Sequence, residues 1–488
     1  MSGESCYYNS FLLELGHKTM RTLTRDIGSH VGEEIELQGW IDTRRDHGKL
    51  IFVDLRDRTG IAQVVFLPNE KELHILADKL RPEWVIFLKG KVQERPKGMV
   101  NENIPSGKYE ITATDLTIVT EAKTPPIDIT GDGREIGEES RMKYRYLDLR
   151  RPRMQENLRM RAKMNAFIRR FLTDKEFAEV ETPYISKSTP EGARDYLVPS
   201  RVYPGKFYAL PQSPQQYKQL LMVAGFEQYF QIVRCFRDED TRGDRQPEFT
   251  QLDIEKSFTS QEDILNLIEE LFTALVKQLY PEKKISESPF PRIPYKEAME
   301  KYGSDKPDLR KDKNDPNELA FVFVVDFPAF EWKETEHRWD AVHHPFTQPR
   351  VENVLDFKKK FKEDPAAIFA DQYDLALNGY EIAGGSIRIH NPALLKEVFE
   401  VMGNKPEEVE EKFGHMLEAF SYGVPPHGGI ASGLDRFVAI LQNEPNIREV
   451  IAFAKTGDGR DLMMQSPSGV SDEQLKELHI KVDTKEKK

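Results

Sequence analysis

The segment FRDEDTRGDRQPEFTQLD, from Phe236 to Asp253, concentrates charged residues between two apolar stretches. Its eighteen residues include three arginines, six acidic residues and two phenylalanines. Guanidinium groups pair with phosphate oxygens, and an aromatic ring stacks on a base, so this combination favours a nucleotide-binding site. An internal network of ion pairs is the alternative, and it is the better explanation for any single Arg–Glu pair.

The sequence around this segment predicts a β-hairpin that would present the charges. QYFQIVRCFRDED and PEFTQLDIEKSF have the composition of strands, and TRGDRQ would form the turn between them. Side chains two residues apart in a strand share one face, so Arg237 would lie beside Glu239, and Gln251 beside Asp253. The hairpin is therefore expected to present a polar, ligand-facing surface on an apolar sheet.

The N-terminal part of the chain is predicted to form a separate β-domain. Five strand-like runs lie between residues 32 and 119, with one helical stretch at residues 70–80: EIELQGWI, KLIFVDLRD, IAQVVFL, WVIFLKGKV and YEITATDLTIV. This spacing indicates a small Greek-key barrel of the oligonucleotide-binding (OB) type, and a generic β-sandwich is the alternative. Pro125, Pro126 and a turn at residues 131–133 then mark a linker.

A strongly basic segment, RMKYRYLDLRRPRMQENLRMRAK, follows the linker from Arg141 to Lys163. It contains nine basic residues and only two acidic ones. Two interpretations fit this excess equally well: a solvated helix face, or a hinge between domains that contacts phosphates.

The rest of the chain predicts a second domain of the α+β class. A helix through Phe171 is followed by EVETPYI, in which Pro183 interrupts regular structure. A capping box at residues 260–263 begins an amphipathic helix, and FVFVVDF and GYEIAGGSIRIH are typical of strands. GGIASGLDRFVAIL is expected to begin as a glycine-rich turn and to continue as a helix. Because strands and helices do not strictly alternate, we expect a mainly antiparallel sheet flanked by helices.

Length and composition limit the class of protein. A chain of 488 residues is long enough for two or three domains with large cores. No apolar run approaches the ~20 residues of a membrane span, and residues 1–19, an extension without assigned function, lack a secretion signal. Two cysteines are too few for a disulfide framework or a zinc cluster and fit a reducing cytoplasm. The net charge of −12 argues against attraction of nucleic acid by the whole surface, but not by a local patch.

Several segments together carry a family resemblance. The sequence resembles the class II aminoacyl-tRNA synthetases, and among them the aspartyl-tRNA synthetases of the bacterial type. Three segments match the motifs of the class: EVETP around Pro183, the Phe236–Asp253 segment, and GLDRF with Arg436. TPEGARDY, QSPQQYKQLLM, AVHHPFT and NGYEIAGGSIRIH match the family between these motifs, and the resemblance extends from Met20 to Val482.

The resemblance implies a domain plan with one departure. Residues 20–122 would be an OB-type domain that binds the anticodon, residues 123–150 a hinge, and residues 151–488 the catalytic domain. Bacterial members usually carry a large insertion between the second and third motifs. Here KYGSDKPDLR runs almost directly into LAFVFVVDFPAFEW, so the insertion is expected to be short or absent near residues 305–320. The first motif builds a subunit interface in this class, so a symmetric homodimer is expected.

The family joins aspartate to tRNA in two steps. Aspartate attacks the α-phosphate of ATP to form aspartyl-adenylate and pyrophosphate, and the terminal ribose hydroxyl of tRNA then takes the aspartyl group. Such chemistry needs no protein nucleophile and depends on positioning and on neutralising charge. By resemblance, Arg237 and Arg436 are the catalytic residues. Arg237 would hold the α-phosphate, and Arg436 would lie over the adenine and reach the terminal phosphate.

The same resemblance assigns further residues to ATP and to magnesium. Phe249 would stack on the other face of the adenine, and the glycines of GGIASG would let the backbone approach the nucleotide. Asp374 and Glu381 are the candidate magnesium ligands, because Mg²⁺ is commonly held by one or two carboxylates plus substrate phosphates. The remaining nucleotide-binding residues would be Glu239, Arg245, Gln251, Glu381 and Gly433.

Aspartate must be distinguished from the nearly isosteric asparagine, so the site must recognise the negative charge of the aspartate side chain. A site that pairs with the substrate's own polar group discriminates by ~10⁴–10⁵, because the wrong substrate leaves buried groups unpaired. By resemblance, Arg388 would clamp the side-chain carboxylate in a bidentate manner, with Lys218 beside it. The residues at the α-amino end would be Asp253, Gln215, Ser213 and Glu191.

The adjacent histidines His343 and His344 also invite a metal interpretation. Neighbouring side chains on an extended segment point to opposite sides, which disfavours a shared metal ion. By resemblance, His343 would help to close the site on the substrate.

The barrel of this family holds single-stranded anticodon bases by aromatic stacking and basic contacts. Phe52 could equally belong to the barrel core, and Val65 stands where many members have an aromatic residue. His47 is frequent in members that charge both tRNA-Asp and tRNA-Asn, so relaxed tRNA specificity is a hypothesis. The other residues at matching positions are Arg44, Arg45 and Gln63.

Two alternative functions share part of this pattern. An asparaginyl- or lysyl-tRNA synthetase shares the barrel and the three motifs, but neither neutral asparagine nor cationic lysine suits the two cations Arg388 and Lys218. A non-catalytic RNA-binding paralogue would have lost Arg237, Arg436 or the acidic pair, and none of these residues is lost.

Overall fold

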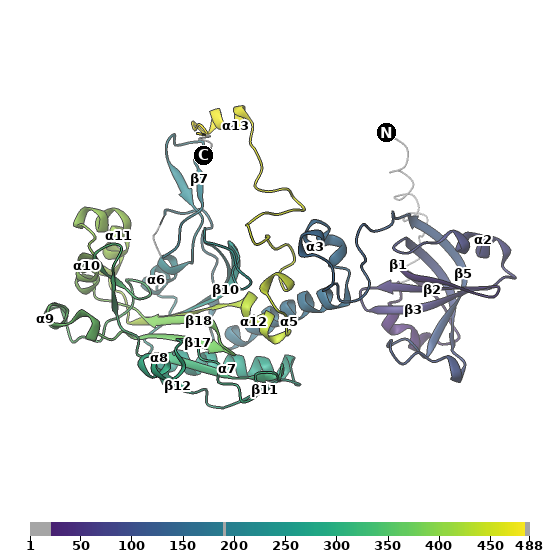
Figure 1. The fold of residues 1–488 in the computed structure, drawn as a ribbon, viewed down its shortest axis with the longest axis horizontal. Helices are drawn as coiled ribbons and strands as arrows, with labels where there is room; N and C mark the ends of the chain where they lie inside the picture. Colours follow the sequence, from purple (N-terminus) through teal and green to yellow (C-terminus); the bar gives the residue numbers. More distant parts are fainter. Residues whose placement is uncertain (1–20, 189–191, 484–488) are drawn as a thin grey trace. The chain divides into compact units, whose positions relative to one another are not determined.

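The computed structural model describes residues 21–188 and 192–483, so the predicted extension lies outside the described part (Figure 1). The chain divides into two compact units, the first ending at Pro126 and the second beginning at Ile127. Each unit has its own hydrophobic core. In the described part of the chain, no helix is long and apolar enough to cross a membrane.

The first unit is a closed five-stranded barrel, as predicted, and the β-sandwich alternative is wrong. The strand order is β1-β2-β3-β5-β4. Side chains of β2 alternate between buried and half-buried along the whole strand, because one face lines the core and the other faces outward. The elements are η1 (Thr24–His30), β1 (Glu34–His47), β2 (Leu50–Asp57), β3 (Gly60–Phe66), α2 (Lys71–Lys79), β4 (Val85–Glu94), η2 (Lys97–Met99) and β5 (Tyr109–Thr120).

The second unit is built on an eight-stranded sheet with the order β12-β14-β17-β18-β19-β10-β9-β6. Neighbouring strands run antiparallel from β14 to β9, and the edge strands β6 and β12 pair in parallel. This sheet confirms the predicted α+β fold. Its strands are β6 (Ala178–Glu179), β9 (Gln228–Phe236), β10 (Glu248–Ser257), β12 (Arg292–Pro294), β14 (Phe321–Val325), β17 (Gln372–Leu377), β18 (Tyr380–Ile387) and β19 (His427–Gly433).

Three helices, α5 (Pro152–Asp174), α7 (Gln261–Leu279) and α12 (Leu434–Leu441), share one core with strands of this sheet. Helix α7 begins at the predicted capping box, where Ser260 and Asp263 accept hydrogen bonds from each other's backbone N–H groups. The other helices are α3 (Glu138–Lys143), α4 (Arg145–Asp148), α6 (Gln215–Val223), α8 (Tyr295–Tyr302), α9 (Val354–Glu363), η3 (Pro365–Ala367), α10 (Pro392–Val401), α11 (Pro406–Ser421), η4 (Ile447–Glu449) and α13 (Asp472–Glu477). Three short strand pairs complete the unit: β7–β8 (Leu197–Pro199, Phe207–Ala209), β11–β13 (Lys284–Ile285, Glu318–Leu319) and β15–β16 (Phe330–Lys333, Arg338–Ala341).

The glycine-rich segment GGIASG forms part of the central strand β19 and not the predicted turn. This strand pairs with β10 on one side and with β18 on the other. A Cβ added to Gly429 would lie 2.0 Å from the carbonyl oxygen of Ile254 and 2.2 Å from a carboxylate oxygen of Glu255. Gly429 therefore permits close packing of strands and of a buried carboxylate, whereas Gly433 does line a cavity.

We expect Gly429→Ala to destabilise the second unit, because the new methyl group has no space beside the backbone of β10. Overpacking typically costs ~1–3 kcal/mol, and contact with backbone places this variant at the upper end. Urea unfolding measures the loss. Gly469→Ala is the matched control, since no atom lies within 4 Å of the added Cβ. Equal stability of the two variants would contradict the prediction.

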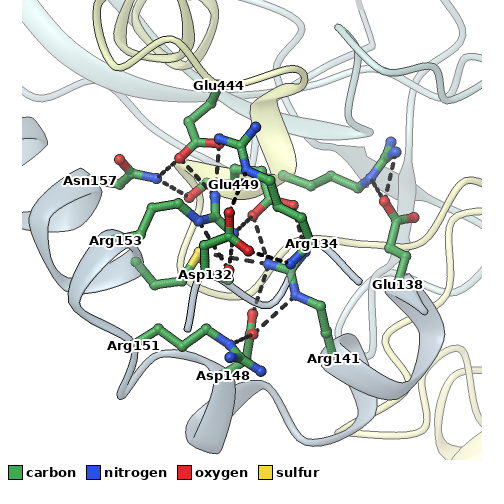
Figure 2. Close-up of polar contacts among 12 residues, drawn as sticks. Asp132, Arg134, Glu138, Arg141, Asp148, Arg151, Arg153, Asn157, Glu444 and Glu449 are labelled. Carbon is green, nitrogen blue, oxygen red and sulfur yellow. Dashed lines mark hydrogen bonds and ion pairs between the residues drawn. The ribbon is translucent and has the colours of Figure 1, made fainter. Parts of the chain in front are cut away.

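The basic segment is solvated only in part: Lys143, Arg159 and Lys163 are exposed, and the phosphate-contacting hinge stays a prediction. Its central arginines are buried in an ion-pair network inside the second unit (Figure 2). The fully buried Asp148 accepts hydrogen bonds of 2.8–3.0 Å from Arg141, Arg145 and Arg151. One carboxylate thus organises three cations.

Two glutamates from the C-terminal part of the chain complete this network (Figure 2). Glu449 accepts hydrogen bonds from Arg141 and Arg153, and Glu444 accepts from Arg153 and Asn157. Arg141 and Glu449 are 308 residues apart. A local window of sequence therefore shows the excess of basic residues but not the acids that neutralise them.

Candidate active site

A cavity of about 260 Å³ lies where β10, β18, β19 and α12 meet the loop after β9. All the residues predicted to bind ATP line it: Arg237, Glu239, Arg245, Phe249, Gln251, Glu381, Gly433 and Arg436. The fold brings them together from three segments that are far apart in the sequence. We call this space the nucleotide cavity.

Two arginines in the nucleotide cavity have donors that no described residue of the chain uses. The guanidinium of Arg237 lies 5.1 Å from the centroid of the Phe249 ring. Arg436 donates to a carboxylate oxygen of Asp244 at 3.1 Å and to the carbonyl oxygen of Glu381. The buried Nε atoms of both arginines have no hydrogen-bond partner among the described residues. Unpaired cationic donors in one cavity suit an anionic ligand such as a phosphate chain.

The predicted hairpin is confirmed, but its first strand is shorter than expected. Strand β9 ends at Phe236, and Asp238 pairs instead with Arg194, outside the hairpin. The prediction that Arg237 and Glu239 share a strand face is therefore wrong, although both line the nucleotide cavity.

A second cavity, also about 260 Å³, shares Arg237, Gln251 and Glu381 with the first. Because the cavities share walls, one ligand with its phosphate in the first can extend its other end into the second. Glu191 lies outside the described residues. The other residues predicted to bind aspartate all line this second cavity, which we call the acid cavity: Ser213, Gln215, Lys218, Asp253, His343 and Arg388.

A fully buried cluster of charges lies at the acid cavity: Lys218, Asp253 and Arg388 line the cavity, and Glu255 pairs with both cations without lining it. Lys218 Nζ lies 2.9 Å from Asp253 and 3.2 Å from Glu255. Arg388 donates from Nε and Nη2 to the two carboxylate oxygens of Glu255 at 2.9 and 3.1 Å. Burial would raise the pKa of Glu255, but Arg388 and Lys218 lower it to about 2. Glu255 therefore stays ionised and holds both cations in place.

Glu255 is a site residue that the sequence analysis missed. It follows Asp253 by two positions in β10 and so shares its face, and this spacing is the signal that could have found it. Glu255 also constrains Arg388, whose Nη1 donates to Ser386 at 2.7 Å and lies 2.9 Å from His344 Nε2. These contacts engage four of the five N–H groups of the guanidinium and leave one on Nη2 for a ligand carboxylate. The bidentate clamp stays a prediction.

Asp253 provides an acceptor in the same cavity. Its Oδ2 accepts from Lys218 at 2.9 Å, and its buried Oδ1 has no hydrogen-bond partner among the described residues. Burial raises the pKa of Asp253 to about 6, against the attraction of Lys218. An ammonium group of a ligand would satisfy Oδ1 and stabilise the ionised form.

From the resemblance to aspartyl-tRNA synthetases, we predict an acid limb near pH 6 in the pH profile of kcat/KM for aspartate. Asp253 is ionised above its raised pKa and neutral below it, and the neutral form does not attract an ammonium group. The profile of kcat/KM for ATP at saturating aspartate is the control, because bound aspartate keeps Asp253 ionised. A flat aspartate profile within one pH unit of this pKa would contradict the prediction.

The histidines His343 and His344 both line the acid cavity, so the prediction that they point to opposite sides is wrong. The chain bends at His343 and is not extended there. Burial and the nearby charge of Arg388 lower the pKa of His344 well below its ordinary value, which keeps the ring neutral. Burial opposes protonation of His343, but Asp374, 3.3 Å away, raises its pKa. The two rings thus have different partners. Among the described residues, no group of three or more His, Cys, Asp or Glu side chains could hold a metal ion.

The predicted magnesium ligands, Asp374 on β17 and Glu381 on β18, lie close together at the acid cavity. A Cβ added to Gly384 would lie 2.9 Å from an oxygen of Asp374 and 3.7 Å from an oxygen of Glu381. Burial and the charge of Asp374 raise the pKa of Glu381. A divalent cation would relieve this repulsion.

On the barrel, three of the predicted anticodon residues gather on the outer face. Arg45 pairs with Phe52 across β1 and β2, and its Nη2 lies 3.5 Å from Gln63 Oε1. Phe52 is half-buried and lies outside the barrel core. Arg44 does not join them, because successive residues of a strand face opposite ways and Arg44 pairs with Asp78 of α2 at 2.7 Å.

Comparisons with known proteins agree with this description. Residues 137–457 match the family of class II tRNA synthetases (D, K and N), and residues 35–119 match the OB-fold nucleic acid binding domain. The fold and the two cavities define a class II aminoacyl-tRNA synthetase.

The relatives narrow the family further. The aspartate–tRNA(Asp/Asn) ligase of Rubrobacter xylanophilus is 44% identical over 577 aligned positions, which cover 93% of this chain and 95% of that protein. The aspartate–tRNA ligase of Lysinibacillus sphaericus is 42% identical, and its alignment covers 92% of this chain and 96% of that protein. The chain belongs to the aspartate–tRNA ligase family. Because the alignments are longer than this chain of 488 residues, these relatives contain segments that it lacks.

Solved structures share the fold. The asparaginyl-tRNA synthetase of Pyrococcus horikoshii, complexed with asparaginyl-adenylate, has a TM-score of 0.72 at 24% identity and covers 90% of this chain and 98% of that one. The aspartyl-tRNA synthetase of Entamoeba histolytica has a TM-score of 0.69 at 23% identity and covers 93% of this chain and 94% of that one.

Proposed function

We propose that this protein activates L-aspartate with ATP and transfers the aspartyl group to tRNA. The observation that carries the proposal is the pair of adjoining cavities. One contains unpaired arginine donors and suits a nucleotide phosphate chain, and the other contains a buried charge cluster and suits a small amino acid. Membership of the aspartate–tRNA ligase family supports the same reaction.

Charge balance in the buried cluster at the acid cavity favours aspartate over its competitors. Lys218 and Arg388 balance Asp253 and Glu255 before any ligand binds. Aspartate adds one ammonium and one side-chain carboxylate to this cluster and so preserves the balance. Asparagine would add the ammonium alone, and lysine would add two positive charges, each of which leaves buried charge uncompensated.

In the first step, an oxygen of the aspartate α-carboxylate attacks the α-phosphorus of ATP, and the bond to pyrophosphate breaks. Arg237 lines both cavities and would neutralise the charge that develops on the α-phosphate. Phe249 and Arg436 would hold the adenine. Asp374 and Glu381 would hold Mg²⁺, which supplies further neutralisation of the phosphates when bound.

In the second step, the terminal ribose hydroxyl of tRNA attacks the activated carbonyl, and AMP leaves. The outer face of the barrel, with Arg45, Phe52 and Gln63, would hold anticodon bases by stacking and polar contacts. His47 is exposed at the end of β1, where it could contact a base, and we propose that both tRNA-Asp and tRNA-Asn are charged. The first-motif segment around Pro183 would form the interface of a symmetric homodimer.

Exchange of pyrophosphate into ATP tests the proposal, with aspartate, asparagine and lysine in parallel. We expect exchange with aspartate alone. Absence of exchange with all three amino acids would overturn the activation step. Charging of purified tRNA-Asp and tRNA-Asn then tests specificity, and strict preference for tRNA-Asp would contradict only the relaxed specificity. Sedimentation velocity tests the homodimer.

A further inference from the structure

A buried carboxylate, Asp435, lies at the edge of the nucleotide cavity. It is the second residue of α12 and directly precedes Arg436. Its side chain is 4% exposed. A carboxylate at this depth needs both hydrogen bonds and a compensating cation, and Asp435 obtains them from two distant parts of the chain.

The first partner is the backbone N–H of Thr250, which donates to Oδ2 at 2.8 Å. The ladder between β10 and β19 begins at the pair Gln251–Gly433, and after Gly433 the chain turns into α12. The N–H of Thr250 therefore has no strand beside it on this edge, and a buried N–H is costly to leave unpaired. Asp435 takes the place of the missing strand.

The second partner is Arg161 of α5. Its Nη1 donates to Oδ1 of Asp435 and, at 3.1 Å, to the carbonyl oxygen of Val450. The guanidinium compensates the buried charge of the carboxylate. Val450 follows Glu449, a member of the ion-pair network in Figure 2, so the same backbone segment anchors both. Asp435 is thus clamped between β10 and α5.

We propose that Asp435 is a positioning residue for the adenine end of the ATP site, an inference that rests on the proposed function. Thr250 lies between Phe249 and Gln251, and both of these line the nucleotide cavity. By joining Thr250 to the start of α12, Asp435 sets the separation between the Phe249 ring and the guanidinium of Arg436. These groups are expected to face the two sides of the adenine, so a fixed separation pre-organises the site.

The test is Asp435→Asn, assayed by ATP–pyrophosphate exchange. Asparagine keeps the size of the side chain but turns an NH₂ group toward one of the two donors, either Thr250 N–H or Arg161. We expect KM for ATP to rise about tenfold or more, the effect of losing a hydrogen bond to a charged group. KM for aspartate should stay within about twofold, since the acid cavity is untouched.

Arg161→Lys is a milder second variant, because it keeps the charge but cannot bridge Asp435 and Val450 with one planar group. It should give a KM for ATP between those of the wild type and Asp435→Asn. A wild-type KM for ATP in either variant would overturn the proposal.

Arg153→Met is the matched control. Arg153 lies on the same helix as Arg161 and pairs with Glu444 and Glu449. Its loss should lower the temperature of unfolding without raising KM for ATP. A similar rise in KM for both Arg153→Met and Asp435→Asn would show general loosening of the unit and overturn the positioning role. The wild-type protein separates the two proposals. Absence of exchange by the wild type would overturn the proposed function. Exchange by the wild type, together with an unchanged KM for ATP in Asp435→Asn, would overturn only the positioning role.

Discussion

Replacement of Arg237 by glutamine should lower kcat of ATP–pyrophosphate exchange by about 10²–10³-fold, the usual effect of removing one group that stabilises developing charge. Arg237 lines both cavities and stands where the α-phosphate and the amino acid must meet. Its guanidinium lies over the Phe249 ring and forms no ion pair with any described residue. The variant should therefore fold normally, and its loss should appear in kcat.

Arg234→Gln is the control for this variant. Arg234 lies on β9, pairs with Glu248 at 2.6 Å and lines neither cavity. Its replacement should leave kcat within about threefold of the wild type, because a half-exposed pair contributes little. Thermal unfolding checks that both variants are folded. A kcat for Arg237→Gln within that same range would remove Arg237 from the catalytic step.

Replacement of Glu255 by glutamine should destabilise the second unit by ~3–5 kcal/mol, because it leaves the buried Arg388 and Lys218 with one carboxylate, Asp253. Aspartate-dependent exchange should be lost with it, since Arg388 would no longer be held. The pKa of Glu255 is lowered from 4.5 to about 2, so its contribution is fully present above about pH 4.5 and disappears as the pH falls through about 2.

Urea unfolding at neutral pH and near pH 3 measures this effect, and the difference from the wild type should narrow at the lower pH. Glu248→Gln is the matched variant on the same strand. Glu248 is partly exposed and pairs with Arg234 and Lys455, so its loss should cost at most ~1 kcal/mol. Equal costs for the two glutamates would show that the buried cluster does not stabilise the fold.

Local patterns were sufficient where a few neighbouring residues determine the structure. The alternation in β2 and the capping box at Ser260 depend on contacts within a few residues, and both were predicted from sequence. The nucleotide and acid cavities were predicted by resemblance to a family, because the motifs preserve the residues that line them. The end of β9 was misplaced, since the partner of Asp238 is Arg194 and not the hairpin.

Predictions failed where a residue's role depends on a distant segment. Gly429 was assigned to a turn, but its neighbours are the backbone of β10 and Glu255, which no local window contains. The basic segment looked exposed because Glu449 lies 308 residues beyond Arg141. The role of Asp435 was not predicted, because the GLDRF motif directs attention to Arg436 and because its partner Thr250 is 185 residues away.

The buried network of Figure 2 also bears on the order in which the protein folds during its synthesis. The barrel is complete by Pro126, so it can fold while the rest of the chain is still being made. Arg141 and Arg153 leave the ribosome soon afterwards, but Glu444 and Glu449 are made near the end. Until then, burial of these arginines would leave charges unpaired, and α5 cannot take its final position. A nascent chain of this protein can therefore carry a folded barrel while its second unit stays incomplete until residues 444–449 have been made.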